Sequence, residues 1–229
     1  MKLHTWTARV LGLSCSCADR TARGPRYPRV MSTAQYLVTT KRRIYVTADT
    51  HFGHEESLAI FARKFASVEE MDSAFIDGIN EVVGAKDILI HLGDFTGPRA
   101  WNAAEFKRVA ALRDRIVCRR IHLVRGNHDP LDARKFDRMF ESVDDYISAR
   151  GIATIDERLV LFHYPIEQWQ GRPNGGFHLH GHVHGHGEAV ARRCDVGVDA
   201  AGNNMRPQLL SDVVARLRQS PASGFVRIK

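Results

Sequence analysis

The sequence is poor in cysteine and has no long hydrophobic run. Four of its 229 residues are cysteine, which is too few to form a framework of disulfide bonds in a chain of this length. No apolar stretch approaches the roughly 20 residues that a membrane-spanning helix needs. These absences argue against a disulfide-stabilised secreted domain and against a membrane partner, and we expect a reducing, cytoplasmic setting.

An even spread of charge is also lacking. The formal net charge is +7. The first 43 residues hold nine Lys and Arg against one acidic residue, whereas the rest of the chain holds 24 basic and 25 acidic side chains. The body of the protein is therefore almost neutral. Nucleic acid stays open as a partner through local patches, but net charge does not favour it.

Residues 1–35 show no regular spacing of apolar side chains and are rich in Arg, Ser, Thr and Gly. Such an Arg-rich, acid-poor composition is compatible with an organelle-targeting peptide. We favour the alternative that the native protein starts further on, since Met31 directly precedes the first structured stretch. We expect a poorly ordered basic extension over residues 1–40 and one domain over residues 41–229.

Strand and helix patterns alternate from residue 43 to residue 145. Three β-branched runs predict strands, at 43–49, 87–94 and 120–129. Apolar residues three and four apart predict amphipathic helices between and beyond them, at 55–65, 68–83, 101–114 and 131–143. Short strands then predominate until Ser211, which we expect to cap a last helix. This order predicts a single α/β domain built around two sheets with helices outside.

Five strand-like runs end in residues that can bind a metal ion. These residues are Asp49 and His51, Asp94, Asn127 and His128, His163, and finally His182 and His184. In an α/β sheet, ligands gather beyond the carboxyl ends of strands because the loops diverge there. A single histidine after a strand is more often packed or solvated, but five independent placements are hard to obtain by chance. We therefore predict a metal site at the carboxyl ends of the strands.

The kinds of side chain at this site indicate which metals it would hold. Two aspartates, one asparagine and at least four imidazoles exceed what one tetrahedral zinc uses, and they include no thiolate. The set suits two divalent ions that share a carboxylate, with Mn, Fe, Zn and Ni as candidates. Two such ions about 3.5–4 Å apart can clamp the attacking and leaving oxygens of a displacement at phosphorus and lower the pKa of bound water.

The motifs DTH, GD, GNHD, FH and GHVH, in this order, resemble the calcineurin-like metallophosphoesterase family over residues 43–206. The resemblance implies a four-layer α/β/β/α sandwich with two mixed sheets. It implies a first metal held by Asp49, His51 and His184. It implies a second metal held by Asn127, His163 and His182. Asp94 would bridge both metals, and His128 would protonate the leaving group.

The resemblance also divides the five histidines that occupy alternate positions from His178 to His186. Taken alone, this tract indicates only a biased, metal-binding stretch. Its motif makes His182 and His184 ligands. We expect His178, His180 and His186 to pack in the sheet, to support the ligands or to be solvated.

Longer motifs, including DTHFGHE, HYPIEQW and LHGHVHG, resemble a small single-domain bacterial and phage-type branch of the family. His54 is expected either to touch substrate or the metal surroundings, or to lie in solvent at a helix start. Tyr164 and Arg172 are expected at the mouth of the pocket, whereas Trp169 is expected to be a packing residue.

One departure from the family separates this chain from the phosphoprotein phosphatases. Their GD motif is followed two residues later by an Asp-Arg pair, whereas this chain reads GDFTGPR. The usual partner of the acid histidine and the usual phosphate-binding arginine are therefore missing. Arg99 is a candidate substitute for that arginine. A small phosphate ester is thus the expected substrate, rather than a phosphoprotein.

We expect a dinuclear phosphoesterase in which a metal-bridging hydroxide attacks a small phosphodiester or phosphomonoester. One alternative is a nuclease or nucleic-acid end-processing enzyme with the same site, which would need a basic groove. The other is a non-catalytic interaction scaffold, although such proteins typically lose ligands and this chain keeps them all. Nothing in the sequence specifies an oligomeric state.

Overall fold

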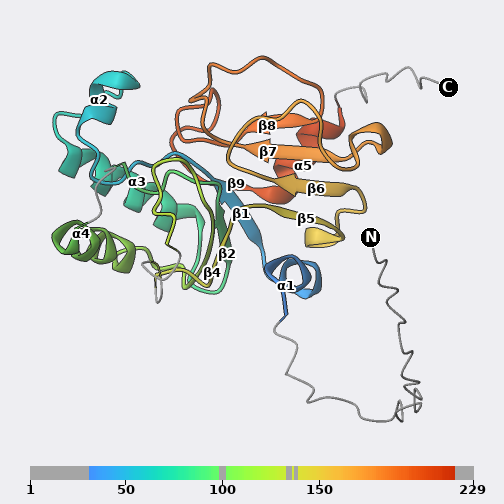
Figure 1. Cartoon of the computed structure of the whole chain (residues 1–229), viewed down its shortest axis with the longest axis horizontal. Helices are drawn as coiled ribbons and strands as arrows, with labels where there is room; N and C mark the ends of the chain where they lie inside the picture. Colours follow the sequence, from blue (N-terminus) through green and yellow to red (C-terminus); the bar gives the residue numbers. More distant parts are fainter. Residues whose placement is uncertain (1–30, 98–101, 133–135, 137–138, 220–229) are drawn as a thin grey trace, which may run out of the picture. The chain divides into compact units, whose positions relative to one another are not determined.

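A five-stranded mixed sheet lies at the centre of the computed structural model, which describes residues 31–97, 102–132, 136 and 139–219 (Figure 1). Its strand order is β4-β3-β2-β1-β9. The strands are β1 (Ile44–Thr47), β2 (Ile88–His91), β3 (Arg120–Val124), β4 (Ser142–Asp144) and β9 (Gln208–Leu209). Strands β1 to β4 pair in parallel, and β9 is antiparallel to β1. The four parallel strands therefore end at one common edge.

A second mixed sheet has four strands in the order β5-β6-β7-β8. They are β5 (Ile147–Arg150), β6 (Arg158–Leu161), β7 (Phe177–His180) and β8 (Arg193–Asp195). Strand β5 is antiparallel to β6, and the other pairs are parallel. Ala48, just after β1, forms a parallel bridge with Gly197, just after β8. The carboxyl ends of the two sheets consequently meet at one place.

Helices complete this part of the chain. They are α1 (Thr33–Thr39), α2 (Glu56–Ile60), α3 (Val68–Val82), α4 (Ala103–Asp114) and α5 (Leu210–Arg218), with 3₁₀ turns at Ile152–Thr154 and Arg172–Asn174. Within the described residues, no helix is both long and apolar enough to cross a membrane.

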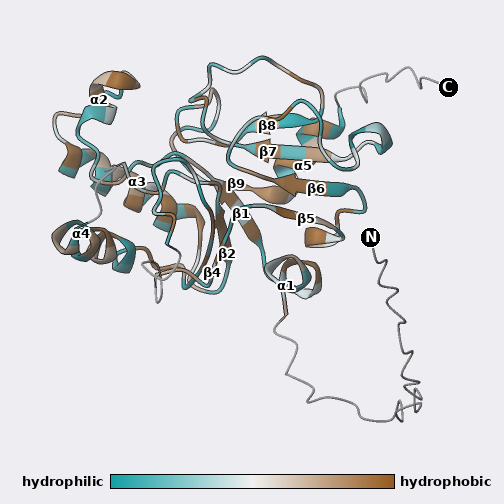
Figure 2. Cartoon of the chain, viewed as in Figure 1, coloured by the Kyte–Doolittle hydropathy of each residue, from teal (hydrophilic) through white to brown (hydrophobic). Residues whose placement is uncertain are grey.

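The first sheet is apolar on both faces, because alternate side chains of a strand point to opposite sides. On β1, Val46 belongs to a core that includes Leu161 of the second sheet. Its neighbour Tyr45 belongs to a core with Phe75 of α3 and Val109 of α4. Figure 2 shows the strands of this sheet coloured largely as hydrophobic. Helices, first sheet and second sheet are thus successive layers.

The α/β class with two mixed sheets, predicted from the sequence, is confirmed. Helices α1 and α5 contribute Leu37 and Val213 to the core between the sheets, and the four-layer order stays a prediction. The described residues from Met31 onward belong to one compact unit. Helix α1 belongs to this unit, although it lies in the range 1–40 that we expected to precede the domain. Residues 1–30 lie outside the described part of the chain.

Three predicted helices differ from the observed elements. The helix expected over 55–65 ends at Ile60, because Ala62 adopts a left-handed φ of 52° and turns Arg63 into the interior. The helix expected over 131–143 is wrong at its end, since Ser142 begins β4; part of that range lies outside the described residues. The N-cap of α5 is Leu209 and not Ser211.

Helix α3 holds the loop that follows β1 through a buried aspartate. The Asp72 Oδ1 accepts a hydrogen bond of 2.8 Å from the Gly53 N–H. Gly53 adopts a left-handed φ of 69°, which other residues rarely adopt, so the loop favours glycine there. Burial raises the pKa of Asp72 to about 6, against the opposing effects of the Gly53 hydrogen bond and of Arg108. Folding therefore favours the protonated form of this carboxyl.

This raised pKa predicts a stability change with a definite sign. Between about pH 4 and pH 6, the folded protein holds the Asp72 proton that the unfolded chain releases. The contribution of Asp72 to stability consequently falls as the pH rises through this window. The stability of Asp72→Asn relative to wild type should increase by about 2 kcal/mol from pH 4 to pH 7, as measured by urea unfolding. A difference that is flat or decreasing with pH would contradict this assignment.

Candidate metal centre

The meeting point of the two sheets collects the residues that follow five different strands. Three overlapping groups have potential ligand atoms within 4.8 Å of one another. The groups are Asp49, His51 and His184; His51, Asp94 and His128; and Asp94, His163 and His182. The structure thus brings together the residues that the sequence predicted as ligands. Their assignment to individual metal ions stays a prediction.

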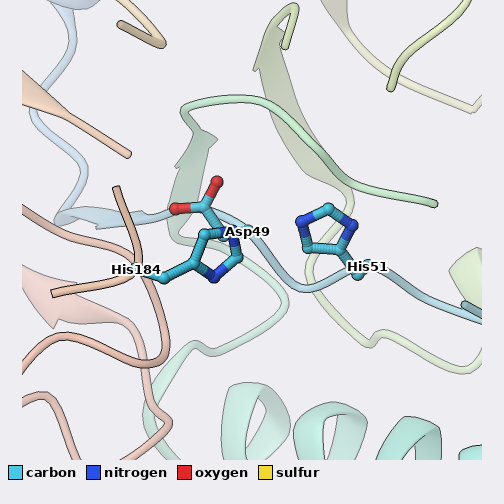
Figure 3. Close-up of side chains that lie close together, drawn as sticks. All are labelled: Asp49, His51 and His184. Atoms are coloured by element: carbon cyan, nitrogen blue, oxygen red, sulfur yellow. The ribbon is translucent and has the colours of Figure 1, made fainter. Parts of the chain in front are cut away.

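Asp49, His51 and His184 form the first group, and their side chains converge in Figure 3. The side chains of Asp49 and His51 are fully buried, and that of His184 is 8% exposed. The rings of His51 and His184 are stacked with their centroids 5.2 Å apart. The group is therefore an enclosed set of one carboxylate and two imidazoles.

The carboxylate of Asp49 is enclosed by backbone. The His182 N–H lies 3.0 Å from both of its oxygens. A Cβ at either Gly181 or Gly197 would come within 2.5 Å of its Oδ2, so only glycine leaves room for this carboxylate. Burial raises the pKa of Asp49 well above its ordinary value. A cation beside it would restore the ionised form, since it would replace the missing solvation.

The ring of His51 gives a direct test of whether a metal fits. Its Nε2 is buried and has no hydrogen-bond partner among the residues that the structure describes, and it lies 3.6 Å from the Asp94 Oδ2. Buried polar atoms are normally paired. Burial lowers the pKa of His51 to about 2, so the ring is neutral and can offer a lone pair. An unpaired imidazole nitrogen facing buried carboxylates is the donor set that a divalent metal requires.

Asp94 stands between the two predicted ligand sets. Its Oδ2 lies 3.6 Å from the His51 Nε2 and 3.5 Å from the His163 Nε2. The His163 Nε2 is also 3.0 Å from the Asn127 Oδ1, and the His163 and His182 ring centroids are 5.1 Å apart. Asn127, His163 and His182 are therefore neighbours, and Asp94 adjoins both predicted ligand sets.

The charge of the Asp94–His163 pair also suits a cation. Burial acts to lower the pKa of His163, but the Asp94 carboxylate raises it to about 9. Burial acts to raise the pKa of Asp94, but His163 holds it at about 2. The two side chains thus form a buried ion pair, in which protonated His163 supplies the positive charge beside the Asp94 carboxylate. A metal ion can take over this role, since it supplies positive charge to the same carboxylate oxygen.

Backbone strain is concentrated at these residues. Five predicted ligands adopt left-handed φ values between 48° and 72°: Asp49, His51, Asp94, His182 and His184. Such φ values are uncommon outside glycine and persist where the surroundings impose them. Here the Asp49 N–H donates to the Gly93 carbonyl and the His51 N–H to the Asp94 carbonyl, both at 3.0 Å. The fold therefore holds these side chains in an arrangement that the isolated loops would not favour.

Asp129 is a supporting residue to which the sequence analysis gave no role, although it is the last residue of the GNHD motif. Its carboxylate accepts hydrogen bonds from the backbone N–H groups of Asp94, Phe95 and Gly126, at 2.8, 3.0 and 2.8 Å. It is only 5% exposed. Asp129 thereby joins the loop after β2 to the loop after β3. The sequence signal that could have indicated this role is an acidic residue in a loop that follows a buried strand.

Arg63 and Asp199 were also missed. The Asp199 Oδ2 accepts a hydrogen bond of 2.7 Å from the His184 Nδ1 and another of 2.7 Å from the Arg63 Nη2. The fully buried Arg63 side chain also donates to the Asp49 carbonyl, at 2.6 Å. This pair orients His184 so that its Nε2 is free, and it fixes the backbone of Asp49 at the same time. A carboxylate on the far nitrogen of a histidine is the usual support for a metal ligand.

The remaining predicted site residues fall on the rim. The His54 Nδ1 lies 3.2 Å from the His51 Nδ1, so His54 is in the site and not a solvated helix-start residue. The His128 Nδ1 lies 2.9 Å from the Gly97 carbonyl. The Tyr164 ring is 4.7 Å from that of His182. Substrate contact by His54 and Tyr164 stays a prediction, and Arg99 lies outside the described residues.

The histidine tract divides into two groups by position, and the ligand roles of His182 and His184 stay a prediction. Among the described residues, His182 and His184 join the potential ligand groups, whereas His178, His180 and His186 do not. His178 and His180 are buried on β7, and His186 is exposed. Trp169 is buried and donates to the Gly176 carbonyl at 3.0 Å, in agreement with a packing role.

The Arg63–Asp199 pair yields a prediction about metal affinity. Asp199→Asn should weaken binding at the first predicted site about 10–100-fold, since His184 and Asp49 lose their common support. Calorimetric titration with Mn²⁺, with thermal unfolding recorded in parallel, measures this effect. Asp87→Asn is the matched control, because Asp87 forms the same two-point pair with Arg43, at 3.1 and 2.8 Å, elsewhere. Equal Mn²⁺ affinity in Asp199→Asn and in wild type would contradict the assignment.

Comparison with known proteins agrees with this geometry. Residues 42–212 match the family described as calcineurin-like phosphoesterase. Uncharacterized protein MJ1445 of Methanocaldococcus jannaschii is 33% identical over 145 residues, which are 62% of this chain and 70% of that protein. The Gene 66 protein of Mycobacterium phage D29 is 29% identical over 162 residues, covering 62% and 78%. The crystal structure of AQ665 from Aquifex aeolicus, a protein of unknown function, is similar with a TM-score of 0.59 at 22% identity, covering 76% of this chain and 99% of that one. The chain belongs to the calcineurin-like phosphoesterase family.

Proposed function

We propose that this protein is a dinuclear metal-dependent phosphoesterase that hydrolyses a small phosphate monoester or diester. The observation that carries the proposal is the position of Asp94, whose Oδ2 lies at similar distances from the His51 Nε2 and the His163 Nε2. One carboxylate between two sets of nitrogen and oxygen donors is the arrangement that a pair of metal ions needs.

In this proposal the two sets divide the ligands. Asp49, His51 and His184 hold one ion, and Asn127, His163 and His182 hold the other, with Asp94 common to both. When bound, the two divalent ions, for which Mn, Fe, Zn and Ni are the candidates, supply positive charge for the phosphoryl oxygens and lower the pKa of a water molecule. The chain itself contributes the placement of the ligands and the movement of a proton.

His128 is the proposed source of that proton. Its backbone N–H donates to the Asp94 Oδ1 at 2.8 Å, which ties the residue to the shared carboxylate. Its Nδ1 hydrogen-bonds the Gly97 carbonyl, which leaves Nε2 as the nitrogen that would exchange a proton with the substrate. The His128 ring lies 5.0 Å from that of His51. His128 is therefore placed to protonate a leaving oxygen from Nε2.

The segment after Asp94 supports a small ester and not a phosphoprotein. Phe95 is fully buried and packs on Phe52, with ring centroids 5.0 Å apart. The Thr96 hydroxyl donates to the Phe52 carbonyl at 2.9 Å. Phe95 and Thr96, the two residues directly after Asp94, thus point into the core. They offer no cation to a protein-bound phosphate.

The shared carboxylate predicts an unequal set of metal losses. Asp94→Asn should lose both ions and at least about 100-fold in activity, whereas His184→Ala and His182→Ala should each lose chiefly one ion. Elemental analysis of purified proteins, with circular dichroism as the control for folding, measures the stoichiometry. Full metal content and full activity in folded Asp94→Asn would exclude the dinuclear arrangement.

The role of His128 predicts a dependence on the leaving group. His128→Ala should keep its metals and its fold, and it should lose about 10²–10⁴-fold in rate for an alkyl phosphate ester. The loss should be small for a nitrophenyl ester, whose leaving group departs without a proton. Parallel kinetics with the two esters test this. A uniform loss would assign His128 to positioning the phosphate, and a loss of metal would make it a ligand.

A further inference from the structure

Aromatic side chains lead from the proposed second metal site toward the surface. The Tyr164 ring lies 4.7 Å from that of His182 and 4.9 Å from that of His163. The ring centroids of Phe162 and Tyr164 are 5.4 Å apart, and those of Tyr146 and Phe162 are 6.0 Å apart. Tyr146 is 43% exposed. We call Tyr164, Phe162 and Tyr146 the aromatic strip, and it joins the metal centre to solvent.

The topology of the second sheet explains why these residues are neighbours. Ile147 at the start of β5 pairs with Leu161 at the end of β6. Tyr146 just before β5 and Phe162 just after β6 therefore stand at the same end of the sheet. The carboxyl end of β6 also delivers His163 to the site. The aromatic strip is thus built on the edge that positions the ligands.

The surroundings of the strip add apolar surface and little net charge. Arg125 follows β3 at this edge, and its Nε donates to the Asp145 Oδ1 at 2.8 Å. The same guanidinium donates to the Leu131 carbonyl, and the Leu131 side chain is 91% exposed. Asp145 thereby neutralises Arg125 beside Tyr146. A long polyanion requires several available cations along its path. This edge therefore suits a flat apolar group better than it suits a polyanion.

We propose that the aromatic strip binds the base of a nucleoside phosphate ester whose phosphorus lies at the metal centre. This inference rests on the proposed function and names its substrate class. Aromatic side chains stack on every nucleobase, since each base has a π-face. The rings meet at 59° and 66°, not face to face. A base can therefore stack on one ring without displacing its neighbour.

A cavity of about 550 Å³ beside Val183 is the competing location. Val183 stands between two predicted ligands, so the cavity also adjoins the site. Its described lining has no aromatic ring and includes Pro165, Gln168, the carboxylates of Glu167 and Glu188, and the guanidinium groups of Arg172 and Arg193. These charged groups make the cavity less suited to the apolar face of a base than the aromatic strip. Gln168→Ala is therefore a matched variant that separates the two locations.

Binding of two phosphonates tests the proposal without hydrolysis. The non-hydrolysable 5′-methylenephosphonates of adenosine and of ribose share the phosphonate and the sugar and differ only in the base. Calorimetry with the full-length, Mn²⁺-loaded protein should give at least about fivefold tighter binding of the adenosine compound. Tyr146→Ala should reduce this preference severalfold, whereas Tyr146→Phe and Gln168→Ala should retain it.

Kinetics with two esters of the same leaving group give an independent reading. Thymidine 5′-(4-nitrophenyl) phosphate should have the higher kcat/KM when compared with methyl 4-nitrophenyl phosphate, and Tyr146→Ala should lower that ratio. If neither these diesters nor the monoester 4-nitrophenyl phosphate is hydrolysed, the proposed function fails, while the phosphonate preference still decides the strip.

Three results would overturn the proposal. The first is equal affinity of wild type for the two phosphonates. The second is a base preference that survives Tyr146→Ala or disappears in Gln168→Ala. The third is binding of a thymidine decanucleotide that is far tighter than that of one nucleotide and falls steeply with salt, which would indicate a polynucleotide groove.

Discussion

The site depends on one buried carboxylate that the fold holds from all sides. Asp94 Oδ2 lies between two imidazoles, and its Oδ1 accepts the backbone N–H of His128. Its own N–H is held by Asp129. Isolated in the interior, such a charge would be costly, so its neighbours must supply positive charge. The five strand ends that converge on Asp94 bring these neighbours to it.

The support for this carboxylate comes from parts of the chain that are far apart in sequence. Arg63 and Asp199 are separated by 136 positions, yet their pair fixes both His184 and the backbone of Asp49. Their rigid contacts offset the left-handed backbone at the ligands, because strained conformations persist only where the surroundings over-determine them. The site is therefore pre-organised by its frame, as metal-assisted catalysis requires. The aromatic strip extends the same edge toward solvent and gives it a place for an organic group.

The sequence was sufficient to predict features that depend on residues close together along the chain. The runs ending in Asp94 and His163 have the composition of buried strands, and polar residues at strand ends follow a general rule of α/β sheets. The role of Arg63 was hidden, because its segment has helical periodicity and the turn at Ala62 depends on tertiary contacts. The strip was hidden as well, since Tyr146 meets Phe162 only through the β5–β6 register. Long-range pairing of this kind is not specified by any local pattern.

The central claim is that two metal ions flank Asp94, and anomalous X-ray diffraction tests it most directly. Crystals grown with Mn²⁺ and measured at the manganese absorption edge should show two strong peaks. One peak should lie among Asp49, His51 and His184, and the other beside His163, with the Asp94 carboxylate between them. A single peak, or peaks at the exposed His186 with none beside Asp94, would contradict the account.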